Sequence, residues 1–304
     1  MSDPNVVASD GDVKNSTFVQ TFSDDPATSS RFFEGRIAEQ NIISFAVGMA
    51  LQSKVPFVSS FGKFFSRTYD QLEMGIISEA NIKIVSSHVG LGPCSDGPSQ
   101  MALSDVAYLS SLTVAKRHSD GRPAMRVIYP CDGPSCFKLT CLMKETNGPC
   151  CLRVLRQDTP LIYSEDAEFS LEKGFNVIKI SPDASLLLIA SGFMVSQAVL
   201  VADKLKDQGL EAAILDIYSL PISTSEFVST IQQSKVSRIL TIEDNYGSSM
   251  GSVVCSVVAQ LLDGIRVKQL FVNRVPKSAR KVEEILQYCQ LDVESIVQSV
   301  WGFV

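Results

Sequence analysis

Four polar segments of the chain combine groups that bind ligands or move protons. Residues 9–17, "SDGDVKNST", hold carboxylates, a lysine and hydroxyls, and residues 37–41, "IAEQN", hold a carboxylate. Residues 59–71, "SSFGKFFSRTYDQ", group aromatic rings, and residues 86–105 read "SSHVGLGPCSDGPSQMALSD". The segments stand where strands are expected to end, and open α/β sheets bind ligands at the carboxyl ends of their strands. They are therefore the candidate binding site.

Two of these segments also fit an ordinary structural explanation. Residues 9–17 fit a turn followed by a helix N-cap as well as they fit a ligand site. Glu39 falls in the first turn of an amphipathic helix, where the helix dipole favours a solvent-exposed glutamate. Without further context, a solvent-exposed first-turn residue is the better explanation for Glu39 than a ligand-binding one.

The other two segments differ in how easily packing explains them. Aromatic residues at the spacing of Phe61, Phe64 and Phe65 more often form a core than a ligand platform. His88 is one of only two histidines, and it stands eight residues before Asp96 in a loop rich in Gly and Pro. Such an arrangement is harder to explain by packing.

Other enzyme and binding classes lack their signatures in this sequence. There is no Gly-x-x-x-x-Gly-Lys-Ser/Thr loop, no Gly-x-Gly-x-x-Gly after a predicted strand, and no serine hydrolase or zincin motif. The eight cysteines form no Cys-x-x-Cys pair, so we expect no zinc site and interpret them as reduced, mostly buried thiols. A net charge of −6 argues against a general nucleic-acid binder.

The composition favours a globular protein of two domains. The chain has 304 residues, and 45% of them are hydrophobic. No apolar run reaches the roughly 18 residues that span a bilayer, so we expect no membrane partner. Residues 1–12 carry no basic n-region of a secretory signal, and we expect a cytoplasmic location.

Short apolar runs rich in β-branched residues alternate with amphipathic helical stretches. This alternation predicts an α/β fold with two parallel sheets, each covered by helices on both faces. The charged stretch 163–174, "YSEDAEFSLEKG", is the predicted linker, which gives domains at 1–163 and 175–304. Helices are predicted at 38–51, 195–208 and 251–262, and strands at 5–8, 55–59, 82–86, 127–129, 150–153, 186–190, 212–216, 238–241 and 267–272.

Taken together, the four segments resemble the transketolase family, which carries a DGD-x-K-x-ST loop, an IAEQN helix, an STF-x-x-FF-x-R-x-x-D-Q segment and an SH…DGPSQMALED loop in the same order. The resemblance continues through "RILTIEDNYGSSMG" at 238–251 and "FVNRVPKSA" at 271–279, so it covers nearly the whole chain. It implies a pyrimidine-binding domain followed by a transketolase C-terminal domain. It also implies transfer of a two-carbon ketol unit between sugar phosphates with thiamine diphosphate.

The resemblance assigns cofactor roles to several residues. Glu39 matches the catalytic glutamate that hydrogen-bonds N1′ of the aminopyrimidine, where a carboxylic acid in an apolar pocket can share its proton with the ring. Asp12 matches an acidic position beside the thiazolium, and Gln100 matches a position near the pyrimidine and the substrate hydroxyls. The family's aromatic pocket for the pyrimidine is matched by Phe61, Phe64 and Phe65.

The resemblance also assigns substrate roles. Ser16, His88 and Arg156 match groups that bind the substrate phosphate, and a guanidinium suits a phosphate through paired hydrogen bonds. Asp96 matches the aspartate that recognises the hydroxyl configuration at C2 of the acceptor sugar.

Several departures from the family are visible. The first domain, whose GDG…N segment binds the diphosphate and a divalent metal (Mg or Ca), is absent, so no metal ligands are expected in this chain. The opening helix of the pyrimidine domain is absent too, which predicts an uncovered sheet face. An insertion of about ten residues lies near 115–125; its His118 has no assigned role. "EDNYGSSMG" stands where the family has "EDHYYEGGIG".

Three interpretations follow for the chain as a whole. It is expected to be an enzyme subunit that forms a homodimer or a complex with a chain carrying the diphosphate-binding domain. Alternatively, it is a truncated transketolase-like protein without activity of its own. A beta subunit of a related 2-oxoacid dehydrogenase is less favoured, because the sugar-phosphate residues His88, Asp96 and Arg156 are all present.

Overall fold

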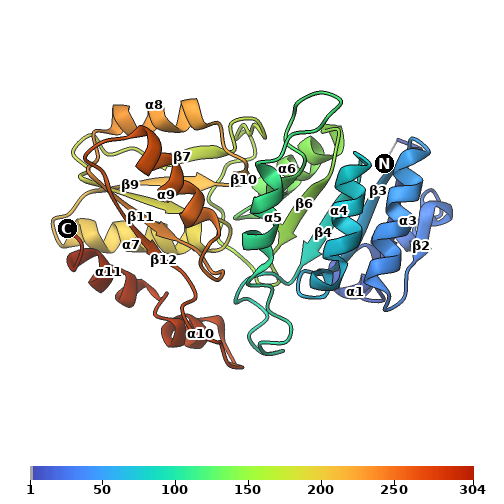
Figure 1. Ribbon diagram of the computed structural model, residues 1–304. Helices are drawn as coiled ribbons and strands as arrows, with labels where there is room; N and C mark the ends of the chain where they lie inside the picture. Colours follow the sequence, from blue (N-terminus) through green and yellow to red (C-terminus); the bar gives the residue numbers. More distant parts are fainter. Residues whose placement is uncertain (1–2) are drawn as a thin grey trace.

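The structure is a computed structural model that describes residues 3–304, and it contains two β-sheets that lie side by side (Figure 1). Six strands of the first sheet are parallel, and the seventh, which comes from the C-terminal half of the chain, is antiparallel. In sheet order these strands are β10 (Ser219–Leu220), β5 (Arg126–Ile128), β6 (Cys150–Val154), β4 (Lys83–Ser87), β3 (Val55–Phe61), β1 (Val6–Asp10) and β2 (Phe32–Glu34).

The second sheet has four parallel strands and one antiparallel edge strand. In sheet order these are β12 (Arg266–Leu270), β11 (Arg238–Ile242), β8 (Leu186–Ala190), β9 (Ala212–Ile217) and β7 (Phe175–Lys179), the antiparallel one. The prediction of two parallel sheets is confirmed except for the antiparallel strands β10 and β7. The sequence did not predict β2, β7 and β10: two of them span only two or three residues, and β7 directly follows the charged linker stretch.

Chain direction explains which helices cover the first sheet. The connections from β2 to β3, β3 to β4 and β4 to β5 all cross the sheet in one direction. Because such crossovers are right-handed, their helices share one face. These helices are α3 (Glu39–Leu51), α4 (Tyr69–Ile77, preceded by the 3₁₀ helix η2, Phe64–Thr68) and α5 (Asp105–Thr113). The connection from β5 back to β6 runs the other way, so α6 (Gly133–Glu145) packs on the opposite face.

Helices cover both faces of the second sheet. The predicted helices at 195–208 and 251–262 are confirmed as α7 and α9, each displaced by one residue, and 38–51 is confirmed as α3 with Ala38 as its N-cap. Helices α7 (Met194–Asp207), α10 (Val282–Cys289) and α11 (Val293–Trp301) contribute to the apolar cluster of one face, and α8 (Thr224–Ser234) and α9 (Met250–Leu261) to that of the other.

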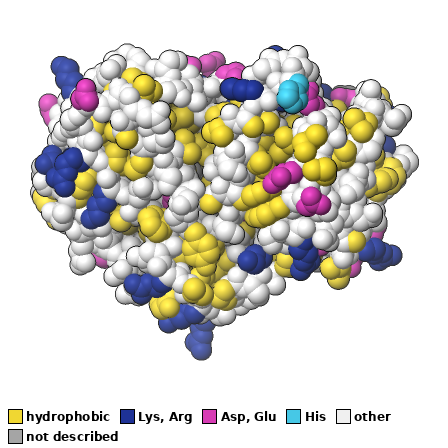
Figure 2. Space-filling view, viewed as in Figure 1, with side chains coloured by type: hydrophobic (Ala, Val, Ile, Leu, Met, Phe, Trp, Pro, Cys, Tyr) yellow, Lys and Arg dark blue, Asp and Glu magenta, His cyan; other side chains and the backbone are white. Residues whose placement is uncertain are grey.

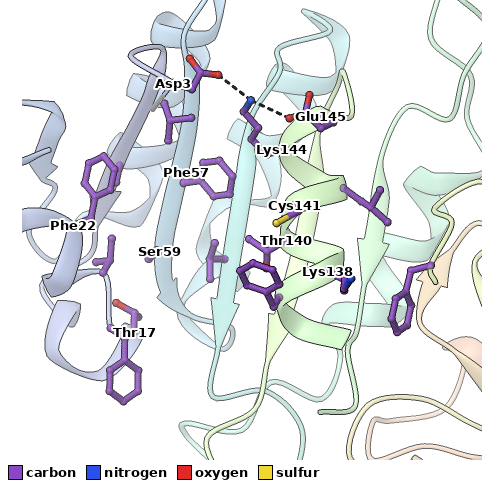
Figure 3. Close-up of a pocket in the computed structure, with 18 of the residues that line it drawn as sticks. Asp3, Thr17, Phe22, Phe57, Ser59, Lys138, Thr140, Cys141, Lys144 and Glu145 are labelled. Carbon is purple, nitrogen blue, oxygen red and sulfur yellow. Dashed lines mark hydrogen bonds and ion pairs between the residues drawn. The ribbon is translucent and has the colours of Figure 1, made fainter. Parts of the chain in front are cut away.

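One face of the first sheet is only partly covered. Besides α6, this face has only the short helices α1 (Lys14–Thr17) and α2 (Gln20–Asp24) and the 3₁₀ helix η1 (Ser29–Arg31) near it in the described chain. Between α1–α2 and α6 lies a groove of about 1180 Å³ whose floor contains Phe57, Ser59 and Val85 (Figure 3). Lys144 forms ion pairs at its rim with Asp3 and Glu145. This groove is the uncovered sheet face expected from the sequence.

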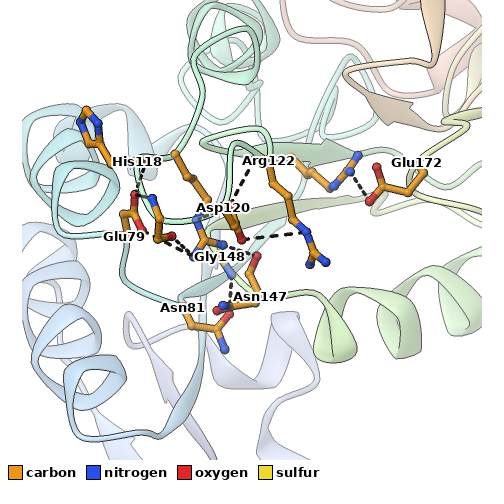
Figure 4. A network of polar contacts seen from close by, with 11 residues as sticks. Glu79, Asn81, His118, Asp120, Arg122, Asn147, Gly148 and Glu172 are labelled. Atoms are coloured by element: carbon orange, nitrogen blue, oxygen red, sulfur yellow. Dashed lines mark hydrogen bonds and ion pairs between the residues drawn. The ribbon is translucent and has the colours of Figure 1, made fainter. Parts of the chain in front are cut away.

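The insertion near 115–125 docks at the amino-terminal edge of the first sheet (Figure 4). Arg117 is buried, donates to the carbonyl of Asn147 at 2.7 Å, and lies 3.7 Å from a carboxylate oxygen of Glu79. Glu79 also accepts hydrogen bonds from the backbone N–H groups of His118 and Ser119. Residues 79 and 147 precede β4 and β6, so the insertion lies at the end of the sheet away from the candidate site.

No helix within residues 3–304 combines the length and the hydropathy needed to cross a membrane. The eight cysteines are free thiols; Cys141 is exposed, and the buried ones are Cys94, Cys131, Cys150, Cys151 and Cys289.

Candidate active site

Three neighbouring parallel strands bring most of the predicted site residues together. In the register of the first sheet Asp10 of β1 pairs with Ser59 of β3, and Phe61 of β3 pairs with Ser87 of β4. The loops after β1, β3 and β4 therefore leave the sheet at one edge. Since neighbouring strands lie about 4.8 Å apart, the loops after β1 and β4 start roughly 10 Å from each other.

Glu39 is the first residue of α3, and its side chain is only 1% exposed. Its Oε2 atom accepts from Nη1 of Arg67 at 2.9 Å, whereas Oε1 is buried without a hydrogen-bond partner in the described chain. A buried oxygen left unpaired costs free energy of about 1–3 kcal/mol, so such atoms usually mark a site that something else completes. The ordinary explanation, a solvent-facing glutamate, does not hold for this residue.

A continuous series of ring contacts links Glu39 to the loop after β4. The guanidinium of Arg67 lies over the ring of Phe64, 5.4 Å from its centroid. The ring of Phe64 stacks on Phe61 at 5.2 Å, and Phe61 stacks on the imidazole of His88 at 3.9 Å. Half-buried Phe61 and Phe64 thus form a wall between the carboxylate and the histidine.

Phe65 does not share this position. Its side chain is buried in the hydrophobic cluster under α3, with Ile42 and Ile43 among its members. Packing in the core is the alternative that the spacing of the three phenylalanines also indicated. A direct contact of Phe65 with the cofactor stays a prediction.

His88 is held in an unusual conformation at the end of β4. It has a positive φ of 58° and is 7% exposed, and its Nδ1 atom lies 2.8 Å from the hydroxyl of Ser87. Burial lowers the pKa of His88, and the positive charge of Arg156 lowers it further. The imidazole is therefore neutral at neutral pH and offers one N–H donor.

Arg156 and Asp96 are brought together from separate segments. Nη1 of Arg156 lies 3.1 Å from Oδ2 of Asp96 and donates to the hydroxyl of Ser95 at 2.7 Å. Both contacts use Nη1, so within residues 3–304 the other donors of the guanidinium are left for further acceptors. The side chains of Arg156 and Asp96 are 40% and 38% exposed, so a ligand can reach them from solvent.

The remaining predicted residues belong to the segments that follow β1 and β4. Gln100 is half-buried, and its Oε1 atom is buried without a partner in the described chain. Ser16 lies on α1, and Asp12 is exposed with φ of 68° in the loop that follows β1. No hydrogen bond or ion pair in residues 3–304 joins Ser16 or Asp12 to His88.

Sequence reasoning missed Asp10, the residue that shapes the loop after β1. Its buried carboxylate accepts from the backbone N–H of Val13 at 2.6 Å and from the hydroxyl of Thr17 at 2.7 Å. Burial raises its pKa to about 6. The signal was present, because Asp10 is the first acid of "DGD" and follows an apolar strand.

A second missed residue is Arg67. The family pattern includes an arginine in this segment, but nothing local indicated that its guanidinium would meet Glu39. The carboxylate therefore lies in a pocket with one cationic neighbour, which corrects the purely apolar surroundings expected for it.

The donor set fits only part of thiamine diphosphate. An unpaired buried carboxylate oxygen beside stacked rings suits a flat heterocycle with ring nitrogens. No group of three or more His, Cys, Asp or Glu side chains in residues 3–304 is arranged to hold a metal ion. The chain thus fits the pyrimidine end of the cofactor and offers no described metal site for its diphosphate.

Comparison with known proteins also indicates a pyrimidine-binding domain. The family model described as "Transketolase, pyrimidine binding domain" matches residues 1–161, and "Transketolase, C-terminal domain" matches residues 176–296. The chain belongs to the transketolase family. It is 36% identical to the transketolases of Rattus norvegicus and Homo sapiens over 301 residues, which is 98% of this chain and 46% of each relative. It thus spans about half the length of the curated relatives that it matches.

Solved structures of the transketolase family show the same fold. A structure titled "Split gene transketolase, inactive beta4 tetramer" superposes with a TM-score of 0.84 at 27% identity, covering 99% of this chain and 92% of that one. The transketolase of Campylobacter jejuni superposes with a TM-score of 0.80, and this chain covers 44% of its length. At 15% identity, the second comparison supports the fold alone.

Proposed function

We propose that this chain provides the pyrimidine-binding and C-terminal domains, residues 1–163 and 175–304, of a transketolase. In this proposal it transfers a two-carbon ketol unit between sugar phosphates, in the cytoplasm, together with a chain that carries the diphosphate-binding domain. The observation that carries the proposal is the Oε1 atom of Glu39, which is buried without a hydrogen-bond partner in the described chain. Contacts from Glu39 to Arg67, Phe64 and Phe61 in turn connect this carboxylate to His88.

Each residue near Glu39 has a definite task in this proposal. Thiamine diphosphate, when bound, would supply a nucleophilic carbon for the ketose carbonyl and an electron sink for the two-carbon fragment. Oε1 of Glu39 holds a proton at the ring nitrogen that faces it, and Arg67 fixes the other oxygen. Phe61 and Phe64 exclude water from the ring, which strengthens that hydrogen bond. Gln100 offers its unpaired Oε1 to a donor on the cofactor or the substrate.

The second task is to bind and orient the sugar phosphate. Arg156 and Ser16 donate to phosphate oxygens. In this proposal the Ser87 hydroxyl donates to Nδ1 of neutral His88, so that Nε2–H of His88 donates to the phosphate as well. Asp96 accepts from a sugar hydroxyl. Asp96 and Arg156 form an ion pair before the substrate binds. Substrate binding replaces this ion pair with two contacts, one from Arg156 to the phosphate and one from the sugar hydroxyl to Asp96.

The domain that holds the diphosphate and its Mg or Ca ion is supplied by another chain in this proposal. A similar split-gene structure is titled "inactive beta4 tetramer", which supports a chain of this kind being inactive without its complement. A truncated transketolase-like protein that only self-associates is the second candidate function, and the inactive tetramer formed by that similar protein favours it.

Self-association is part of the proposal. Figure 2 shows hydrophobic side chains gathered over the part of the molecule where α3, α4 and α5 lie in Figure 1. Large exposed apolar side chains on or next to these helices include Phe45, Leu51, Met74, Ile77 and Val114. An exposed apolar surface of this kind is typical of a twofold subunit interface.

Reconstitution tests the proposal directly. The purified chain is assayed for ketol transfer alone and after mixing with a candidate chain that carries the GDG…N segment, with thiamine diphosphate and Mg²⁺ present. We expect activity only in the mixture. An inactive mixture in which this chain associates only with itself would favour the second candidate function.

A further inference from the structure

The loop at residues 88–104 carries His88, Asp96 and Gln100, yet it contains no regular helix or strand of its own. Apart from turns, it has one isolated bridge between Val89 and Ala102. Loops of this length are uncommon in compact domains, and contacts outside the loop must fix their shape. The contacts that do so here come largely from the C-terminal half of the chain.

Asp244 makes the first of these contacts. It is the second residue after β11 in the second sheet and is fully buried. Its carboxylate accepts from the hydroxyl of Tyr129 at 3.0 Å and from the backbone N–H of Leu91 at 3.4 Å. Gly90 has φ of 67°, and a Cβ atom there would overlap Oδ2 of Asp244. The carboxylate therefore lies directly against the backbone of the loop.

Three further contacts hold the middle and the far end of the loop. The N–H of Tyr246 donates to the carbonyl of Leu103 at 2.8 Å, and the N–H of Ala279 donates to the carbonyl of Cys94 at 2.9 Å. At Gly97 a Cβ atom would lie 2.7 Å from the hydroxyl of Ser278. The loop is thus held at both ends and on either side of Asp96 by residues of the C-terminal half.

A buried arginine connects these contacts beneath the loop. Arg153 is fully buried, donates from Nε to Asp105 at 2.8 Å and from Nη2 to the side chain of Asn245 at 2.7 Å. Its guanidinium also lies over the ring of Tyr129, 4.0 Å from the centroid. Asp105 begins α5 directly after the loop, so the guanidinium joins the end of the loop to the strand end that carries Asp244.

We infer that Asp244 is a positioning residue that sets the conformation of the 88–104 loop, so that the C-terminal half of the chain governs sugar-phosphate binding. It would act through Leu91 and Tyr129. The effect on sugar-phosphate binding rests on the proposed function, whereas the effect on the loop does not.

The second sheet offers a matched control residue. Asp216 lies at the end of β9, is fully buried, and accepts from the hydroxyl of Tyr163 at 2.8 Å. Its partner Tyr163 belongs to the predicted linker, outside the 88–104 loop. Asp244→Ala and Asp216→Ala each remove a buried carboxylate that accepts from a tyrosine hydroxyl, but only the first removes a contact to the loop.

Amide hydrogen exchange of the purified chain is the first measurement. We expect Asp244→Ala to raise exchange in peptides covering residues 89–103 at least tenfold, and Asp216→Ala to leave these peptides within about twofold of the unmodified chain. Asp244→Asn keeps the acceptor oxygen and should restore most of the protection of the loop amides from exchange. This variant also tests the inference if the alanine variant fails to fold. Unchanged exchange in Asp244→Ala, or an equal rise in both alanine variants, would overturn the inference.

Kinetics of the reconstituted complex is the second measurement. We expect Asp244→Ala to raise KM for phosphorylated sugars at least tenfold while kcat changes less than about threefold, with no such split for Asp216→Ala. Equal effects of the two variants on KM would overturn the role in substrate binding. If the unmodified complex shows no ketol transfer, the proposed function fails, and the exchange result still decides whether Asp244 positions the loop.

Discussion

Nη1 of Arg67 lies 2.9 Å from Oε2 of Glu39, and this ion pair leaves Oε1 of the same carboxylate buried without a partner. Arg67 is half exposed and Glu39 is almost fully buried. The pair therefore orients the carboxylate from the solvent side and leaves one oxygen for a ligand on the inner side.

Glu39→Gln should abolish ketol transfer in the reconstituted complex while leaving assembly intact. The amide keeps the shape of the side chain but cannot hold a proton for the ring nitrogen, and loss of such a group costs about 100-fold or more. Steady-state rates and size-exclusion chromatography check this. Glu226→Gln, an exposed glutamate in the first turn of α8, is the matched control and should be active. Near-normal turnover of Glu39→Gln would make Glu39 an ordinary first-turn residue.

The isolated chain should bind thiamine diphosphate weakly, with a Kd on the order of millimolar. Stacking on Phe61 and Phe64 together with one hydrogen bond to Glu39 stabilises a flat ring by only a few kcal/mol, about 4 kcal/mol at millimolar Kd. Isothermal titration calorimetry of the purified chain measures this directly. Micromolar binding would show that the chain holds the diphosphate as well.

Arg156→Ala should remove much of the preference for phosphorylated over free sugars in the reconstituted complex. Charge-assisted hydrogen bonds to a phosphate contribute roughly 1.5–3 kcal/mol each, so KM for a phosphorylated donor should rise at least tenfold. A non-phosphorylated donor should be nearly unaffected. Arg122→Ala, in the remote insertion, serves as the control. If both donors slow equally in Arg156→Ala, then Arg156 is structural.

Asp216→Asn should flatten the pH dependence of stability. Burial raises the pKa of Asp216 to about 7 from its ordinary 3.8, so the folded state holds this proton more tightly than the unfolded state. The resulting stabilisation is complete below pH 4 and is lost as the pH rises through 7, by up to about 4 kcal/mol. Urea unfolding from pH 4 to 8 checks this. Parallel curves for the two proteins would contradict it.

Arg117→Ala should destabilise the fold without changing ketol transfer. The substitution leaves the carbonyl of Asn147 and the carboxylate of Glu79 without their buried partner, which costs about 1–3 kcal/mol. Arg122→Ala, an exposed residue of the same insertion, should change stability by less than about 0.5 kcal/mol. The urea midpoints of both variants measure this, and a change of KM in Arg117→Ala would contradict the remote position of the insertion.

The sequence by itself determined the fold class, most of the strands and three of the longer helices, because hydrophobic periodicity is a local property. Strand β8 was predicted to the residue, and α3, α7 and α9 to within one residue. The gathering of Phe61 and His88 at one sheet edge was also predictable. Parallel strands end at the same edge, so polar segments that follow neighbouring strands meet there.

Only the tertiary structure decided which polar groups are paired. Arg67 meets Glu39 across 28 residues and Asp244 meets Leu91 across 153, and no local pattern encodes either contact. The short strand β10 joins the first sheet from the second half of the chain for the same reason. A hydrogen-bond partner depends on which surfaces pack once both sheets have formed, so the sequence supplied the residues of the site and the packing supplied their partners.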